Sequence, residues 1–294
     1  MSGVCFYALL RLPTRWRWIA LVLLELLVFL SPLIVPERTK FPRLMASLAA
    51  ILVGVKLYDL HRTAQAGLRP GPWQFVTYLP NALNLVWRRV LAEPRPPWRN
   101  DLIQCLAGLT AGAASVLLLI QVFRIDWRMY PAALEHVTKI VGLFLVIRTL
   151  PNGLAAGCRL LAIPATDAMG SFFSARTPAE FWRRYNRPAE QFFYEYVFKP
   201  SGGVRHPVRA TLITFAFSGI VHEYVFDIAA GYRAIGWQMA FFLIQGVASV
   251  ATLRLRPTGW RAAACIVLTL AFNLATARIF FESMNRVLPF YVSR

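Results

Sequence analysis

A hydrophobic stretch with a histidine in it decides how this chain folds: residues 212–226 read LITFAFSGIVHEYVF. Apolar and small residues precede His222 for most of the length of a membrane-spanning helix. An ionisable side chain inside a bilayer costs several kcal/mol unless it lines a cavity or has a partner, which makes it a functional candidate. A neutral imidazole is also the side chain best suited to take a proton near pH 7. The stretch therefore predicts a membrane helix that carries a chemically active histidine.

The composition agrees with a membrane protein. Of the 294 residues, 57% are hydrophobic and only 16% are charged, and the mean hydropathy is +0.49. A soluble domain carries roughly a quarter of charged residues. Several apolar runs also approach the ~20 residues that are needed to cross a bilayer. We therefore expect an all-α polytopic membrane protein.

Seven spans are predicted from the apolar runs, at residues 18–35, 44–58, 102–123, 132–150, 208–228, 237–253 and 261–280. The basic residues before the first run resemble those of a signal peptide, but no small-residue cleavage site follows, so this run is expected to be retained. Residues 73–87 mix apolar and polar side chains and predict an interfacial or re-entrant helix. Residues 94–98 predict a stiff linker. Because the sequence shows no internal repeat, residues 1–294 are expected to form one domain of about seven to eight transmembrane helices plus interfacial helices.

The net charge of +18 raises the question of nucleic-acid binding. The basic residues lie between the apolar runs rather than along one face, which favours membrane topology and contact with anionic headgroups instead. With the N-terminus inside, the cytoplasmic segments hold 19 Lys or Arg and the external segments hold 8. This bias predicts a cytoplasmic N-terminus and a cytoplasmic loop at residues 151–207.

Other classes of site are disfavoured by missing motifs. The four cysteines form no CxxC pair and the histidines lack ligand-like spacing, so neither a disulfide framework nor a metal site is predicted. The sequence has no G-x-S-x-G elbow and no Walker A loop, and no G-x-G-x-x-G follows a predicted strand. Covalent serine enzymes and ATPases are therefore disfavoured.

The loop before the fifth span has helix signals of its own. Thr177 is predicted to cap a helix that begins at Pro178, with Glu180 closing a capping box. Pro188 is expected to end this helix and to begin another one. Residues 199–203 predict a turn before the fifth span.

His222 is the candidate base. It lies about fourteen residues into its span, or ~20 Å from the cytoplasmic end, so its substrate would need a tunnel. Ser218 lies on the same helical face one turn earlier, and Gly219 is expected to leave space beside it. Two alternatives remain open: the histidine bonds a neighbouring helix for packing, or it forms a proton path with Glu223 and Asp227, which lie on another face.

The polar cluster at residues 181–186 supplies a second set of candidates. Asn186 is either a fixed amide donor for a substrate carbonyl or its developing oxyanion, or a residue that simply breaks the chain before Pro188. The same loop contains four basic side chains: Arg183, Arg184, Arg187 and Lys199. They either bind phosphates of a nucleotide-bearing donor or contact lipid headgroups.

These residues resemble a known family. Residues 174–186, SARTPAEFWRRYN, and residues 214–224, TFAFSGIVHEY, are similar to the core of the membrane-bound O-acyltransferase (MBOAT) superfamily. The wax synthase-like branch is the most similar, and residues 237–246 resemble its next span. The resemblance covers about residues 171–247. Tyr185 stands where the family usually has Trp, and a Gly often found in the wax synthase motif is missing, which concerns the acceptor more than the reaction.

The resemblance implies an MBOAT-like fold that encloses a tunnel and an acyl-CoA-dependent O-acyltransferase without a further cofactor. The acceptor would be a lipid alcohol, giving a wax or glycerolipid ester. His222 would act as general base and Asn186 would orient the reacting groups. Further substrate contacts would come from Trp182, Arg183, Arg184, Tyr185, Arg187, Ser218 and Glu223. The alternatives are an MBOAT that acylates a polysaccharide or a small metabolite, and a proton-coupled transporter. A multi-pass protein of the bacterial inner membrane is expected, with membrane lipids and no nucleic acid as partners.

Overall fold

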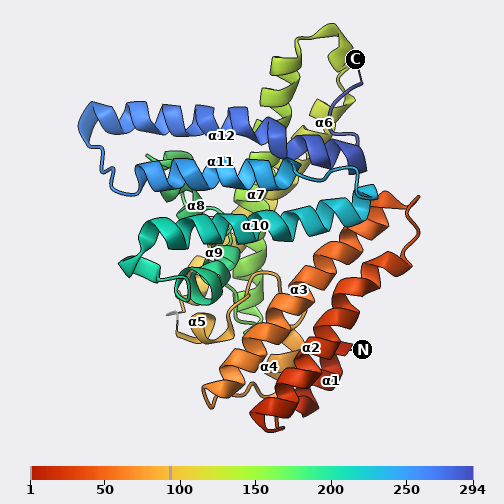
Figure 1. Ribbon diagram of the computed structural model, residues 1–294. Coiled ribbons are helices and arrows are strands. Elements are labelled where there is room, and N and C mark those ends of the chain that lie inside the picture. The colour runs from red at the N-terminus through yellow and green to blue at the C-terminus, as the bar shows by residue number, and fades with distance from the viewer. Residues whose placement is uncertain (1, 93–94, 294) are drawn as a thin grey trace.

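The computed structural model describes residues 2–92 and 95–293 (Figure 1), and within these residues it contains helices and no strand. The longer helices are α2 (Thr14–Leu30), α3 (Lys40–Gln65), α6 (Trp98–Arg124), α7 (Ala132–Leu160), α10 (Pro207–Ala230), α11 (Trp237–Thr252) and α12 (Gly259–Val287). The shorter ones are α1 (Ser2–Leu9), α4 (Pro72–Tyr78), α5 (Trp87–Ala92), α8 (Pro178–Arg184) and α9 (Arg187–Phe193). Single turns are η1 (Ser31–Ile34), η2 (Trp127–Met129), η3 (Phe172–Ser174), the π-helical η4 (Tyr194–Phe198) and η5 (Gly203–Arg205). The predicted linker at residues 94–98 begins outside the described residues.

The helices confirm an all-α polytopic membrane protein. Within the described ranges, six helical segments are long and apolar enough to cross a membrane: Thr14–Ile34, Lys40–Gln65, Trp98–Arg124, Ala132–Leu160, Pro207–Ala230 and Gly259–Val287. They correspond to six of the seven predicted spans. The remaining predicted span, at residues 237–253, corresponds to α11, which has 16 residues. At ~1.5 Å per residue it is shorter than the ~30 Å hydrocarbon core.

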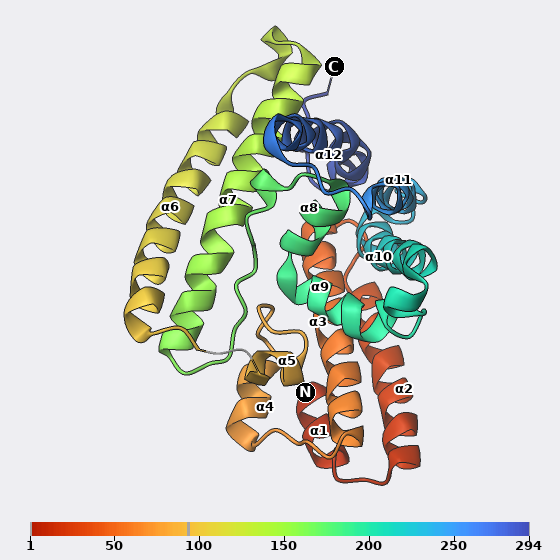
Figure 2. The same cartoon turned by 90° about the vertical axis from the view of Figure 1, so that its left-hand side faces the viewer.

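Two sets of helices cross each other steeply. Helices α10, α11 and α12 lie side by side, and their axes cross those of α2 and α3 as well as those of the α6–α7 hairpin (Figures 1 and 2). The spans therefore cannot all be parallel to the membrane normal. The short helices α8 and α9 lie between α7 and the α10–α11 pair (Figure 2). This arrangement brings Trp182 of α8 against Phe215 of α10, the helix that carries His222, with 5.7 Å between the ring centroids.

The predicted loop at residues 151–207 begins too early. Helix α7 continues through Pro151 and ends at Leu160, so residues 151–160 are helical. Proline is tolerated inside such a helix when a neighbouring helix packs tightly against it. Here α6 does so: a Cβ atom on Gly153 would lie 2.7 Å from the backbone nitrogen of Leu109. The sequence around Pro151 does not show this contact, which explains the error.

The predicted interfacial or re-entrant helix at residues 73–87 is wrong in its second half: α4 ends at Tyr78, residues 79–86 form an irregular turn, and α5 begins only at Trp87. The ammonium group of Lys56 donates hydrogen bonds to the carbonyl oxygens of Tyr78 at 2.6 Å and Asn81 at 2.8 Å. The hydroxyl group of Tyr78 donates to the carboxylate of Asp59 at 2.7 Å. Polar side chains of α3 thus satisfy the turn, as irregular backbone within a membrane protein requires.

Candidate active site

His222 is held by its own helix. Its Nδ1 atom lies 2.8 Å from the carbonyl oxygen of Ser218, one turn earlier on α10. A carbonyl oxygen can only accept a hydrogen bond, so this contact requires the proton on Nδ1 and leaves the lone pair on Nε2. Nε2 has no hydrogen-bond partner among the described residues. The predicted alternative, a hydrogen bond from His222 to a neighbouring helix, is therefore absent from this part of the chain, and Nε2 is free to take a proton.

Aromatic side chains surround the imidazole. The ring of Phe242 lies 4.4 Å from that of His222, and the ring of Phe280 lies 5.8 Å away. Trp182 of α8 packs against the same Phe242 at 5.8 Å, and its indole N–H donates to Gln245 at 2.9 Å. His222 and the predicted substrate residue Trp182 thus share a neighbour. The surface around the base is mostly apolar.

The prediction that Gly219 leaves space beside His222 is wrong. A Cβ atom on Gly219 would lie 2.9 Å from the sulfur and 3.3 Å from the Cα atom of Met239. The missing side chain allows α11 to approach α10 closely. Gly246 of α11 faces Phe215 of α10 in the same way, with 2.9 Å from its ideal Cβ position to the Phe215 Cβ. Both glycines therefore serve helix packing.

Glu223 points to α11. Its Oε1 atom accepts a hydrogen bond from the backbone N–H of Met239 at 2.8 Å, in the first turn of that helix. A carboxylate is favourable at a helix N-terminus because the first N–H groups have no partner within the helix. Asp227 follows one turn later and interacts with Glu223. The structure thus gives Glu223 a capping role, and its predicted contact with substrate stays a prediction.

Asn186 begins helix α9 in a left-handed conformation, with φ 48° and ψ 62°. Its side-chain oxygen accepts a hydrogen bond from the backbone N–H of Ala189 at 3.4 Å. The interpretation of Asn186 as a break in the chain before Pro188 is therefore confirmed, and its side chain also caps α9. The side chain is exposed, and its amide nitrogen forms no hydrogen bond with the described residues. The nitrogen can still donate to a substrate, so the predicted catalytic role stays open.

Backbone hydrogen bonds tie Asn186 to the loop before α8. The N–H of Arg187 donates to the carbonyl oxygen of Ala168 at 2.8 Å, and the N–H of Gly170 donates to that of Arg184 at 2.7 Å. The N–H of Asn186 itself lies 3.2 Å from the sulfur of Met169. Residues 168–170 therefore fix the position at which Asn186 leaves the loop.

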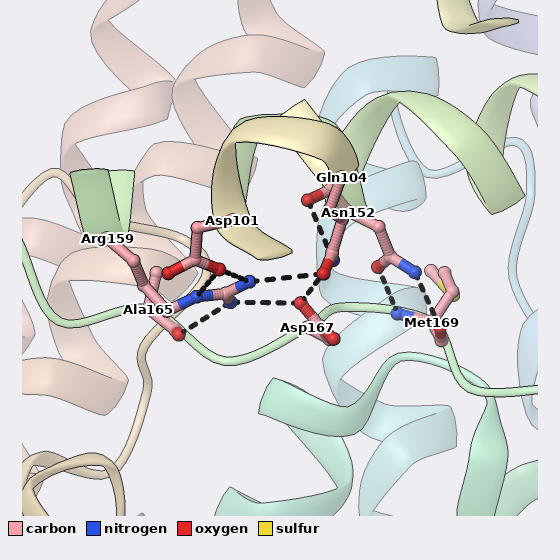
Figure 3. A network of polar contacts seen from close by, with 7 residues as sticks. All are labelled: Asp101, Gln104, Asn152, Arg159, Ala165, Asp167 and Met169. Carbon is pink, nitrogen blue, oxygen red and sulfur yellow. Dashed lines mark hydrogen bonds and ion pairs between the residues drawn. The ribbon is translucent and has the colours of Figure 1, made fainter. Parts of the chain in front are cut away.

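A polar network anchors this loop on α6 and α7 (Figure 3). The amide of Asn152 exchanges two hydrogen bonds with the backbone of Met169: it donates to the carbonyl oxygen at 2.7 Å and accepts from the N–H at 2.8 Å. Arg159 forms ion pairs with Asp101 at 2.7 Å and with Asp167 at 2.9 Å. None of these residues was predicted from the sequence. Polar side chains in two otherwise apolar helices were the signal that could have identified them.

The other predicted substrate residues of α8 and the start of α9 differ in their surroundings. Arg184 pairs with Glu180 and donates to the carbonyl oxygen of Ser171 at 2.8 Å. Tyr185 stacks on Phe181 at 5.5 Å, and burial raises the pKa of its hydroxyl group to about 12. Arg187 is half-buried, whereas Arg183 is exposed. A contact of Arg183 with a phosphate therefore needs the least rearrangement.

The helix that carries these residues begins as predicted. The hydroxyl group of Thr177 accepts a hydrogen bond from the backbone N–H of Glu180 at 3.1 Å, and Pro178 is the first residue of α8. The predicted capping box is only half formed. The carboxylate of Glu180 accepts from the N–H of Arg176 at 2.6 Å, one residue before the cap. The start of α8 was thus readable from local sequence.

Comparison with known proteins places these residues in a family context. The family model MBOAT, membrane-bound O-acyltransferase family, matches residues 116–277. A curated relative, Acyl-CoA–sterol O-acyltransferase 1 of Arabidopsis thaliana, is 26% identical over 192 residues, which cover 60% of this chain and 55% of the relative. The match thus spans about half the length of that relative. The region matched by the family model contains every predicted catalytic and substrate-binding residue.

Proposed function

The chain belongs to the membrane-bound O-acyltransferase family, and from this premise we propose that it transfers a fatty acyl group from acyl-CoA to the hydroxyl group of a lipid alcohol. The protein is an integral, multi-pass membrane protein. A single observation carries the proposal: His222 has its Nδ1 bonded to Ser218 and its Nε2 free within an aromatic environment. This is the arrangement that a general base for a buried hydroxyl group needs.

The proposed reaction is a direct transfer. Nε2 of His222 takes the proton of the acceptor hydroxyl while the oxygen attacks the thioester carbonyl. The amide nitrogen of Asn186 donates to the developing oxyanion. The tetrahedral intermediate then expels the thiolate of CoA, which takes the proton from the imidazolium. The products are an ester and free CoA.

The surroundings of the base favour an apolar acceptor. Phe242, Phe280 and Trp182 form an apolar surface, so contact with a hydrocarbon chain would be favourable because it removes apolar area from water. The same surface offers few hydrogen-bond partners to a sugar. The name of the curated relative includes a sterol acceptor, which supports a lipid alcohol as a class. We take wax alcohols and diacylglycerol as the first acceptors to test and add a sterol because of that relative. The acyl chain would occupy an apolar tunnel.

The proposed orientation places the donor on the cytoplasmic side. The excess of basic residues supports a cytoplasmic N-terminus and a cytoplasmic loop between α7 and α10. Arg183, exposed on α8, would meet the phosphates of acyl-CoA there. A bacterial inner membrane remains the proposed location.

An acceptor panel tests the function. Purified protein in nanodiscs is given oleoyl-CoA with a fatty alcohol, diacylglycerol, a sterol or no acceptor, and released CoA and ester are both measured. His222→Ala is the matched variant. CoA release and ester formation that require an acceptor and vanish in His222→Ala would support the proposal.

Other outcomes identify the alternatives. Ester formation only with polysaccharide or small polar acceptors would show that the acceptor is not a lipid alcohol, although the reaction would still be O-acyl transfer. No thioester consumption, together with proton flux into vesicles that depends on His222 and Glu223, would replace the enzyme by a transporter. Full turnover by His222→Ala would remove His222 as the base.

A further inference from the structure

A basic hollow lies at the start of α10, away from the candidate active site. It has a volume of about 570 Å³ and is lined by Arg205, His206, Pro207, Val208, Arg209, Leu212, Ile213 and Arg254. Three arginines and a histidine thus converge on a mixed apolar floor, and the lining contains no acidic residue. Arg254 belongs to the connection between α11 and α12, so the hollow joins two parts of the chain.

The arginines of the hollow are available to a ligand. Arg205, Arg209 and Arg254 are all exposed, and within the described chain no ion pair involves them. The Nε–H group of Arg209 donates a hydrogen bond to the carbonyl oxygen of Ser201 at 2.9 Å. The other N–H groups of its guanidinium form no further hydrogen bond with the described residues. Arg159, in contrast, forms ion pairs with Asp101 and Asp167, which compensate its charge. The hollow is open to its surroundings and carries positive charge that no acidic side chain of its lining compensates.

The apolar part of the hollow continues along the outside of α10. Ile213 is 41% exposed and Ile220 is 56% exposed. At about 100° per residue, the nine residues from Ile213 to His222 turn the helix by about 180°, so Ile213 points away from His222. Ile220 lies close to the same outer face. If a ligand bound in the hollow and its apolar chain lay along this face, the chain would extend away from His222, the proposed base.

From this geometry we infer that the hollow binds the phosphate of an anionic phospholipid, whose acyl chains lie along Ile213 and Ile220 on the outer face of α10. Basic recesses between membrane helices at the cytoplasmic surface suit such headgroups. The phosphates of CoA have the same chemistry, but a donor bound here would have its thioester on the wrong side of α10. The exclusion of CoA from this hollow rests on His222 as the proposed base, whereas binding of an anionic lipid does not require the proposed reaction.

Native mass spectrometry of the purified full chain tests the inference. The protein is released from detergent with added dioleoyl phosphatidylglycerol or dioleoyl phosphatidylcholine, and bound lipids are counted over a concentration series. We expect one phosphatidylglycerol molecule to bind tightly to each protein, and no phosphatidylcholine molecule to bind with similar affinity. Arg205→Gln with Arg254→Gln should weaken phosphatidylglycerol about 25-fold, since each arginine near an anionic lipid contributes roughly fivefold. These two side chains make no hydrogen bond within the described residues, so their loss should not unfold the protein.

The control removes the same charge elsewhere. Arg124→Gln with Arg128→Gln changes two exposed arginines outside the hollow and should leave the tight lipid in place. Ile213→Asn should weaken dioleoyl phosphatidylglycerol but not the chain-free glycerol phosphate. Equal lipid binding by both double variants would overturn the inference. So would loss of free CoA binding in the Arg205 and Arg254 variant with unchanged phosphatidylglycerol binding, because the hollow would then be the donor site.

Discussion

His222 donates a hydrogen bond from Nδ1 to the carbonyl oxygen of Ser218, 2.8 Å away on the same helix. The bond links the tautomer of the imidazole to the helix itself, so no neighbouring helix is needed to hold Nε2 free. Backbone carbonyl groups and carboxylates are the usual partners that fix which imidazole nitrogen carries the proton, and here the partner is a carbonyl group. Glu223, the adjacent carboxylate, is instead bonded to the backbone of Met239.

Replacement of His222 tests the free Nε2. His222→Ala and His222→Gln should both lower the rate of acyl transfer by at least about 10²–10⁴-fold, because neither side chain can take a proton near neutral pH. Turnover is measured as ester formation. The melting temperature of both variants should stay close to that of the wild type, because the lost hydrogen bond is local to α10. An active His222→Gln variant would show that the imidazole is not the base.

Asn186 has two separable roles. Asn186→Asp keeps an oxygen that can cap α9 and a side chain tolerated at positive φ, but it lacks the amide donor. We expect an unchanged melting temperature and a loss of about 10²–10³-fold in turnover. Full activity of this variant would reduce Asn186 to its capping role.

Asn186→Ala is a poorer test. Alanine removes the cap and keeps the Cβ atom in the left-handed region, where it costs roughly 1–2 kcal/mol that no local side-chain hydrogen bond then offsets. Asn186→Gly avoids that strain, so it is the appropriate partner of Asn186→Asp. Comparing the melting temperatures of the glycine and alanine variants separates backbone strain from loss of the cap.

Asn152 is expected to position Asn186 through the loop at Met169. Asn152→Leu leaves the buried backbone N–H and carbonyl group of Met169 without their partners, at about 1–3 kcal/mol each. We expect a lower melting temperature and a reduced kcat, with KM for the acyl-CoA little changed. Asn273→Leu is the control, because the Asn273 amide bonds only Thr269 of its own helix. A decrease in kcat by the control equal to that of Asn152→Leu would show a general effect of stability.

Gly219 is expected to control the distance between α10 and α11. Gly219→Val places methyl groups against Met239 and should lower both the melting temperature and the activity by pushing Phe242 away from His222. Met239→Ala should partly rescue the variant, since it removes the sulfur that a Cβ atom would meet. Gly157→Ala is the control, because its nearest contact is the ordinary 3.4 Å to the sulfur of Cys105. Failure of Met239→Ala to restore either quantity would place the damage elsewhere.

The sequence by itself determined the class of the protein and most of its local structure. Long apolar runs predicted the spans because a helix must present hydrocarbon along the whole thickness of a bilayer. Thr177 with Pro178 predicted the start of α8, because helix caps depend on a few neighbouring residues. Pro188 predicted a second helix, and α9 begins one residue earlier, at Arg187. His222 was recognisable as an ionisable group within an apolar span.

Only the tertiary structure decided which distant groups meet. Helix α7 continues through Pro151, where α6 packs against it. The space beside Gly219 is occupied by Met239 of α11. The link from Asn152 through Met169 to Asn186 joins three segments with no common sequence pattern. Hydrophobic periodicity and caps act over a few residues, whereas such contacts depend on how complete helices pack in space. That is why the sequence identified the two candidate catalytic residues but not the groups that hold them.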